Sequence, residues 1–293
     1  MPRPLRLFEP DGVYFITGRC LQTRLLLRPS KAVNDIVGGV LARAIDEFDV
    51  DVFAFVFVSN HFHLLVRSQS CEIPAFMQYL RSNIAKKVGA LVDWRGKFWD
   101  RRYDAEPVLD DDALVGRLRY ILAHGVKEGL VARPEDWPGL TSIHELSAGE
   151  ARAFAWPGGG DIDGHATTKR VLRVVPLPCW AGDDEDVRRV RVLALMRDIE
   201  AAACEERGGR PVLGARNVAA QDPHSKPASP KRSRRPQCHA STQAARDEYR
   251  AKYTAFADAY VEASAAYRSG RLDVEFPAFA HRPPWVPPHR LAA

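Results

Sequence analysis

The sequence lacks any long apolar run. Its 293 residues include no uninterrupted apolar stretch of about 18 residues, the length that a membrane-spanning helix needs. Residues 1–6 also lack the apolar stretch of a secretory signal peptide. We therefore expect no membrane partner and a cytoplasmic protein.

Cysteine is scarce, and charge of either sign is not in large excess. The five cysteines are scattered, and no two of them form a CxxC pair, so neither a disulfide framework nor a zinc site of that type is expected. A formal net charge of +5 permits a nucleic-acid partner but does not require one. The 46% hydrophobic and 27% charged residues are typical of a soluble globular chain.

Alternating helix and strand patterns fill the first half of the chain. Apolar, aromatic and β-branched runs predict strands at residues 12–21, 51–58, 61–66 and 97–109. Apolar residues at helical spacing predict helices at about 30–48, 74–91 and 113–124. The short turn at residues 59–60 makes the second and third strands antiparallel. This order predicts an α+β fold: a ferredoxin-like antiparallel sheet with helices on one face.

The second half is less regular and predicts a mainly helical C-terminal extension. We expect residues 1–147 to form one domain and residues 148–207 to form a partly helical connecting region. Residues 208–240 are rich in proline, serine and basic residues, including the run 231–235, and are interpreted as a mobile linker. A last helix and tail follow at 241–293, and the aromatic stripe of this helix is interpreted as a packing surface.

The sharpest local motif is His61-Phe62-His63. Alternate side chains of a strand share a face, so the two imidazoles project together and can hold one divalent metal. A pair of surface or hydrogen-bonded histidines is the simpler interpretation of this motif taken alone.

The predicted helix at 113–124 carries a second group of polar residues. Its apolar stripe leaves Arg117, Tyr120, His124 and Lys127 on the opposite face, with Tyr120 and His124 one turn apart. An ordinary solvent-facing surface would have the same pattern. A phenol is a poor nucleophile because its pKa is about 10, yet it can attack a phosphodiester that a metal polarises.

Several separate stretches together resemble the single-tyrosine HUH transposase family, and within it the REP-associated tyrosine transposases. Residues 12–18 are similar to the family's first strand, and residues 56–66, with the two histidines, to its metal-binding strand pair. The other stretches are 96–103, 118–131 and 134–138, which resemble the segment after the second helix, the tyrosine helix and the turn that follows it.

The resemblance implies roles for particular residues. His61 and His63 are metal ligands and Tyr120 is the nucleophile, while His124 is a further ligand where the family usually carries Asn or Gln. The implied cofactor is a divalent metal, Mg²⁺ or Mn²⁺. An imidazole at position 124 suits Mn²⁺ or Zn²⁺ better than Mg²⁺, which prefers oxygen ligands.

The implied activity is that of a transposase that cleaves and rejoins single-stranded DNA through a 5′-phosphotyrosine intermediate. The implied partner is single-stranded or hairpin DNA, bound through phosphate contacts from Arg101, Arg102, Arg117 and Lys127, and a homodimer is one possible assembly. Such a protein would be nucleoid-associated when bound to DNA. Two alternatives stay open: an inactive DNA-binding descendant of a transposase, and an unrelated metal-dependent hydrolase that uses the histidines alone.

Overall fold

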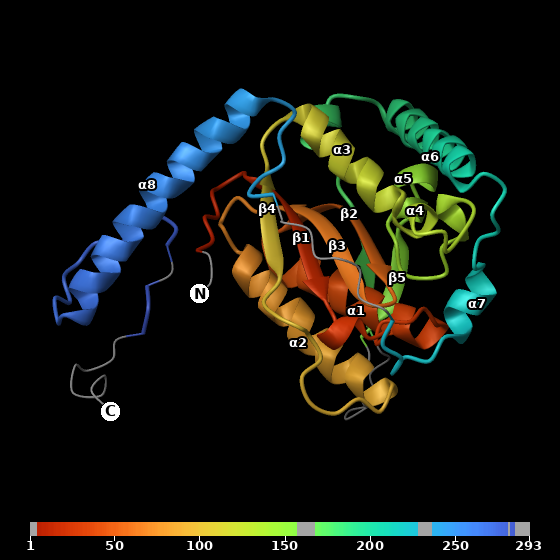
Figure 1. Cartoon of the computed structure of the whole chain (residues 1–293), viewed down its shortest axis with the longest axis horizontal. Coiled ribbons are helices and arrows are strands. Elements are labelled where there is room, and N and C mark those ends of the chain that lie inside the picture. The colour runs from red at the N-terminus through yellow and green to blue at the C-terminus, as the bar shows by residue number, and fades with distance from the viewer. Residues whose placement is uncertain (1–4, 157–167, 228–235, 281, 285–293) are drawn as a thin grey trace.

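The computed structural model describes residues 5–156, 168–227, 236–280 and 282–284. At its centre is a four-stranded antiparallel sheet with the strand order β2-β3-β1-β4 (Figure 1). Its strands are β1 (Val13–Arg19), β2 (Asp51–Val58), β3 (His61–Arg67) and β4 (Asp104–Val108). This order, with one helix between β1 and β2 and another between β3 and β4, confirms the predicted ferredoxin-like α+β fold.

The two crossover helices cover one face of the sheet, as predicted. They are α1 (Lys31–Glu47) and α2 (Ile73–Leu91), and their apolar stripes share one core with the side chains of this face. The Ser30 hydroxyl accepts a hydrogen bond from the backbone N–H of Val33 (3.2 Å), which fixes the start of α1.

Later helices add a layer on the opposite face of the sheet (Figure 1). The first is α3 (Asp111–Leu122), which starts after Asp110, whose carboxylate accepts a hydrogen bond from Ala113 N–H (2.8 Å). The others are α4 (His124–Lys127), α5 (Ile143–Ala148) and α6 (Glu185–Arg207). This layer is required because β2 is apolar on both faces, and neither face can stay exposed to water.

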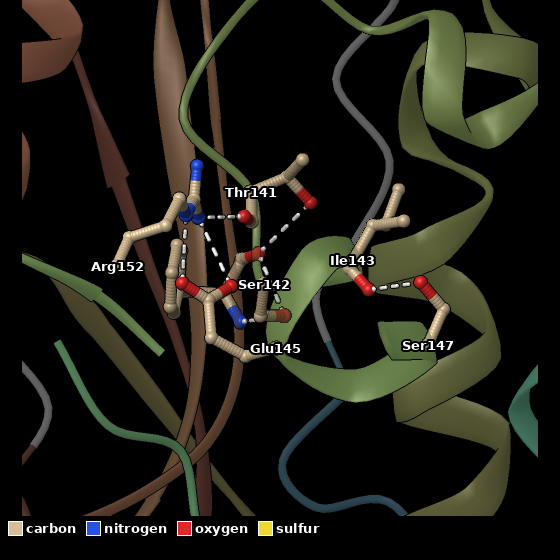
Figure 2. A network of polar contacts seen from close by, with 7 residues as sticks. Thr141, Ser142, Ile143, Glu145, Ser147 and Arg152 are labelled. Atoms are coloured by element: carbon tan, nitrogen blue, oxygen red, sulfur yellow. Dashed lines mark hydrogen bonds and ion pairs between the residues drawn. The ribbon is translucent and has the colours of Figure 1, made fainter. Parts of the chain in front are cut away.

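Irregular chain closes the β2 edge of the sheet. Backbone groups of β2 exchange hydrogen bonds with Leu140 and Ser142 (2.8 and 3.0 Å). Arg152 holds this segment in place, because it donates to both carboxylate oxygens of Glu145 (2.7 and 3.0 Å) and to the carbonyl of Thr141 (Figure 2). Paired in this way, the edge offers no free template for another strand.

The C-terminal part of the chain closes the β4 edge. His239 N–H donates to the carbonyl of Pro107 (2.8 Å), and Leu109 N–H donates to the carbonyl of His239 (2.9 Å). The chain then enters α8 (Gln243–Arg268), a long helix that starts beside β4 and extends away from the body (Figure 1).

Part of the expected linker packs on the body. It contains α7 (Ala215–Ala220), in which Val218 is fully buried, and Leu213 N–H donates to the carbonyl of Gly129 (2.9 Å). Residues 208–227 therefore depart from the expected mobile linker, because Val218 enters the core of the second helical layer. The basic run 231–235 lies outside the described residues.

The remaining elements are a small hairpin and short helical turns. The hairpin packs on α1, and no helix in the described residues is long and apolar enough to cross a membrane. These elements are β5 (Arg152–Ala155), β6 (Lys169–Leu172), η1 (Leu21–Thr23), η2 (Pro134–Asp136) and η3 (Pro178–Trp180).

Candidate functional site

Two histidines project from the same face of β3. Strand alternation places His61 and His63 together, while Phe62 between them packs on Trp99 in the opposite core (ring centroids 5.4 Å apart). The two imidazoles therefore lie on the face that α3 and α4 cover, and both are buried.

The third histidine of the cluster comes from the helical layer above the sheet. His124 begins α4, is only 2% exposed, and has its ring centroid 4.7 Å from that of His61 and 4.8 Å from that of His63. One ring nitrogen from each of the three residues lies within 4.8 Å of the other two. Three such donors can surround one ion and leave further coordination positions open.

All three imidazoles are held in the neutral form. Burial lowers the pKa of His61 and His63 well below the usual value, and repulsion by the charged form of His124 adds to this effect. Burial, followed by the charges of Lys127 and Arg19, lowers the pKa of His124 to about 3. Neutral imidazole is the form that binds a metal ion.

Two of the rings are oriented from outside the cluster. His61 Nδ1 lies 2.5 Å from Asn60 Oδ1, and His63 Nδ1 lies 2.9 Å from Thr17 Oγ1. When these Nδ1–H groups donate, each Nε2 keeps a lone pair for a metal.

Unpaired ring nitrogens in the cluster fit a bound metal ion. Among the described residues, His63 Nε2 and both ring nitrogens of His124 are buried without a hydrogen-bond partner. Buried polar atoms are nearly always paired, so such unpaired nitrogens need another partner. A divalent ion between the three rings would supply it for His63 Nε2 and for one ring nitrogen of His124.

Tyr120 lies against the histidine cluster. It stands one helical turn before His124, on α3, and its ring centroid is 5.3 Å from that of His63 and 5.4 Å from that of His124. The ring is half-buried and meets Phe15 edge to face (5.6 Å). A phenol next to three potential metal ligands can attack a phosphate held by the same ion.

Two cations flank the Tyr120 ring. The ammonium nitrogen of Lys127 lies 4.0 Å from the ring centroid and the guanidinium carbon of Arg117 lies 4.9 Å from it. Lys127 also pairs with Glu128 (3.5 Å), whereas Arg117 makes no ion pair with any described residue. Burial lowers the pKa of Arg117, as expected for a charge that lacks a close anionic partner.

The structure separates the predicted site residues into two groups. Arg101 and Arg102 are exposed at the start of β4, where they line a cavity with α8 away from the imidazoles. The group that comes together around the imidazoles consists of His61, His63, Arg117, Tyr120, His124 and Lys127.

Several residues of the site have no signal in the sequence. Thr17 reaches His63 because β1 and β3 pair in the register that sets these two residues opposite each other. The Phe15 ring stacks on the His63 ring, with centroids 4.9 Å apart, and it also contacts the ring of His239. His239 Nε2 in turn lies 2.8 Å from Glu106 Oε2. Only the strand register and the path of the C-terminal segment reveal these contacts.

Comparison with known proteins gives matches to a family model and to a relative, each over part of the chain. Residues 24–123 match the family model described as "Transposase IS200 like". A Haemophilus influenzae protein assigned as a REP-associated tyrosine transposase is 24% identical over 168 residues, which cover 54% of this chain and 94% of that protein.

Two solved structures match part of the chain. A REP-associated tyrosine transposase bound to a REP hairpin matches with a TM-score of 0.44 and 16% identity, over 59% of this chain and 100% of its own. A Deinococcus radiodurans protein assigned as a transposase matches with a TM-score of 0.30 and 17% identity, over 41% of this chain and 95% of its own.

Proposed function

We propose that this chain cleaves and rejoins single-stranded DNA. The premise is its membership, through residues 24–123, of the IS200-like transposase family. Tyr120 is the proposed nucleophile, and a divalent metal is the proposed cofactor. The observation that carries the proposal is the position of the Tyr120 ring, whose centroid lies 5.3 Å from that of His63 and 5.4 Å from that of His124. Both imidazoles have a buried ring nitrogen with no hydrogen-bond partner in the described residues.

In the proposed reaction the Tyr120 hydroxyl oxygen attacks the phosphorus of a DNA phosphodiester. A 5′-phosphotyrosine bond forms, the bond from phosphorus to the 3′ oxygen breaks, and the phenol proton leaves while the 3′ oxygen gains one. A 3′-hydroxyl then attacks the phosphotyrosine and releases the tyrosine, so no external energy source is needed. Arg117 and Lys127, beside the ring, hold the phosphate oxygens through charge-assisted hydrogen bonds.

The proposed metal ligands are His61, His63 and His124. When bound, the ion would polarise the scissile phosphate and balance the charge that develops on it. Because three imidazoles suit Mn²⁺ or Zn²⁺ better than Mg²⁺, we infer that the working ion is Mn²⁺ or Zn²⁺ rather than Mg²⁺.

We also propose that residues 1–147 form the transposase domain and that the later residues support it. The connecting region 148–207 contains α6, whose apolar side packs in the same core as α3, the helix that carries Tyr120. Residues 208–240 and 241–293 then bring His239 and α8 to the β4 edge.

A covalent-adduct assay tests the proposal. Labelled single-stranded DNA from the regions flanking the gene is incubated with the protein and Mn²⁺, and denaturing gels detect label bound to protein. We expect an adduct with the wild type and with Tyr79→Phe, a matched control on the other face of the sheet, and none with Tyr120→Phe, which should still bind metal and DNA. Cleavage that persists in Tyr120→Phe would contradict the role of Tyr120 and favour a metal-dependent hydrolase.

A second candidate function is DNA binding without catalysis. His124 favours it, because the family that this chain resembles usually carries Asn or Gln at this position. A wild-type protein that binds hairpin DNA but forms no adduct with Mn²⁺, Zn²⁺ or Mg²⁺ would support this alternative.

A further inference from the structure

The segment 236–242, which precedes α8, brings a histidine to the edge of the Tyr120 site. Two backbone hydrogen bonds join His239 to β4, along which the segment runs (Figure 1). Ser241 N–H donates to Asp110 Oδ2 (2.7 Å), so the segment is also fixed to the start of α3. His239 lies outside residues 24–123, and the family match therefore does not account for it.

The side chain of His239 is bound to Glu106 on β4. Its Nε2 and Glu106 Oε2 are 2.8 Å apart, and each side chain is only 13% exposed. Glu106 stands opposite Phe15 of β1, so its side chain shares a sheet face with the imidazole of His63. A carboxylate therefore lies on the same face as the proposed catalytic residues, where a DNA phosphate would meet its negative charge.

The Phe15 ring connects this pair to the proposed catalytic residues. Its centroid lies 5.5 Å from that of His239, 5.6 Å from that of Tyr120 and 4.9 Å from that of His63. The guanidinium carbon of Arg117 lies 5.4 Å from the same centroid. His239 and Arg117 therefore contact one aromatic ring, and Glu106 lies next to this ring in the sheet.

Arg117 is a second possible partner for Glu106. Burial lowers the pKa of Arg117, and Tyr120 and then Glu106 act in the opposite direction, so the carboxylate is within electrostatic reach of the guanidinium. In the described residues Arg117 forms no ion pair, and its guanidinium lies over the rings of Phe15 and Tyr120 instead.

The hydrogen bond from His239 explains why Glu106 does not take Arg117. A partly buried carboxylate without a partner attracts a nearby cation strongly, because nothing else offsets its lost hydration. His239 supplies a partner for this carboxylate and so weakens its attraction for the guanidinium.

We propose that His239 is a positioning residue of the Tyr120 site. It occupies Glu106, and the guanidinium of Arg117 consequently stays beside the Tyr120 ring, free to bind a DNA phosphate. Without His239, Glu106 would capture Arg117. This inference rests on the proposed function in taking a DNA phosphate as the ligand of Arg117.

Urea unfolding of the full-length protein tests the exchange of partners without DNA. Arg117→Gln is made in the wild type and in His239→Ala, which keeps the backbone bonds that hold the segment. We expect Arg117→Gln to lower the urea midpoint by roughly 0.3 M more in the His239→Ala background, because only there does it remove an ion pair with Glu106. This difference should vanish when both backgrounds carry Glu106→Gln. An equal effect of Arg117→Gln in the wild type and in His239→Ala overturns the proposal.

Binding of single-stranded DNA measures the consequence for Arg117. The probe is an oligonucleotide from the region flanking the gene, in chelator so that no cleavage occurs. We expect His239→Ala to weaken binding about tenfold and to reduce the slope of log K against log salt by about 0.7, the value for one phosphate contact to a single strand. Arg117→Gln should have the same effect, and the two substitutions together should cause no further loss. His144→Ala, which removes an exposed histidine of α5, should change neither quantity.

Glu106→Gln distinguishes positioning from simple anchoring of the segment. A glutamine carries no charge with which to capture Arg117, so adding Glu106→Gln to His239→Ala should restore both the affinity and the salt slope. His239→Gln, whose amide nitrogen can replace Nε2 as the donor to Glu106, should keep wild-type values. If His239 only anchors the segment, Glu106→Gln cannot restore binding, and a loss that persists in the double variant overturns the positioning role.

The outcomes separate this inference from the proposed function. A coupling between Arg117 and Glu106 that appears only in His239→Ala supports the inference even when the wild type forms no adduct and the proposed catalysis fails. An absent coupling overturns the inference even when the wild type forms the covalent adduct.

Discussion

Added Mn²⁺ should stabilise the protein against unfolding, through His61, His63 and His124. The three rings are buried and held neutral, and one ring nitrogen from each lies within 4.8 Å of the other two, so the folded state offers three donors that an unfolded chain does not hold together. An ion that binds only the folded state stabilises it by mass action.

The size of the effect follows from the ion concentration. At one hundred times the dissociation constant the free energy of unfolding rises by about 2.7 kcal/mol, and at one thousand times it rises by about 4.1 kcal/mol. For a protein of this size, about 2–4 °C of Tm accompany each kcal/mol, so we expect a rise of roughly 5–10 °C at the lower concentration.

The assay is thermal unfolding, followed by circular dichroism, of protein first stripped with a chelator and then titrated with Mn²⁺. His63→Ala should abolish the rise in Tm, because it removes a ligand whose Nε2 is buried and unpaired. Tyr120→Phe should keep the rise, because it removes only a hydroxyl beside the cluster. A rise of equal size in His63→Ala would refute the reasoning, because the ion would then bind elsewhere.

Three further predictions concern the site and its support. His124→Gln should shift the metal preference toward Mg²⁺ by replacing a nitrogen donor with an oxygen, which parallel Mn²⁺ and Mg²⁺ titrations of Tm would measure; an unchanged preference would argue against ligation by His124. Gly18→Ala would bring a methyl group 2.4 Å from an aromatic ring of β3. This clash should lower the free energy of unfolding, measured in urea, by about 1–3 kcal/mol. No loss would mean that the ring moves aside. Arg152→Met leaves the buried carboxylate of Glu145 unpaired and should lower the free energy of unfolding by about 3–5 kcal/mol in the same assay. Arg170→Met, which breaks a more exposed ion pair, should lower it by less than about 1 kcal/mol. Equal losses in the two variants would contradict this reasoning.

Local periodicity was sufficient to predict the main helices and strands and each half of the cluster, whereas the meeting of the two halves was implied only by the resemblance to the single-tyrosine HUH transposases. A two-residue period places His61 and His63 on one face of a strand, and a helical turn places Tyr120 beside His124, whatever surrounds them. The order of strands and helices then restricts the sheet to few arrangements, of which the ferredoxin-like one is observed.

Contacts between distant segments could not be predicted from the sequence. Thr17 reaches His63 only through the register of β1 against β3, and a shift by one residue would turn its side chain to the other face. Glu106 and His239 are 133 positions apart, and no periodic pattern connects them. The basic composition around α7 suggested a mobile linker, but the burial of Val218 and the hydrogen bond from Leu213 N–H to the carbonyl of Gly129 hold this segment on the body.

The histidine cluster is hard to explain by stability alone. Each buried nitrogen without a partner costs about 1–3 kcal/mol, and three such nitrogens occur on His63 and His124. Other residues on the same sheet face, Leu65 and Val56, are apolar and pack without such a cost, so an apolar cluster at these positions would be the more stable choice. Local arrangements that cost stability concentrate at functional sites. The placement of Tyr120 against these rings, between two cations, therefore points to chemistry rather than packing as the reason for the cluster.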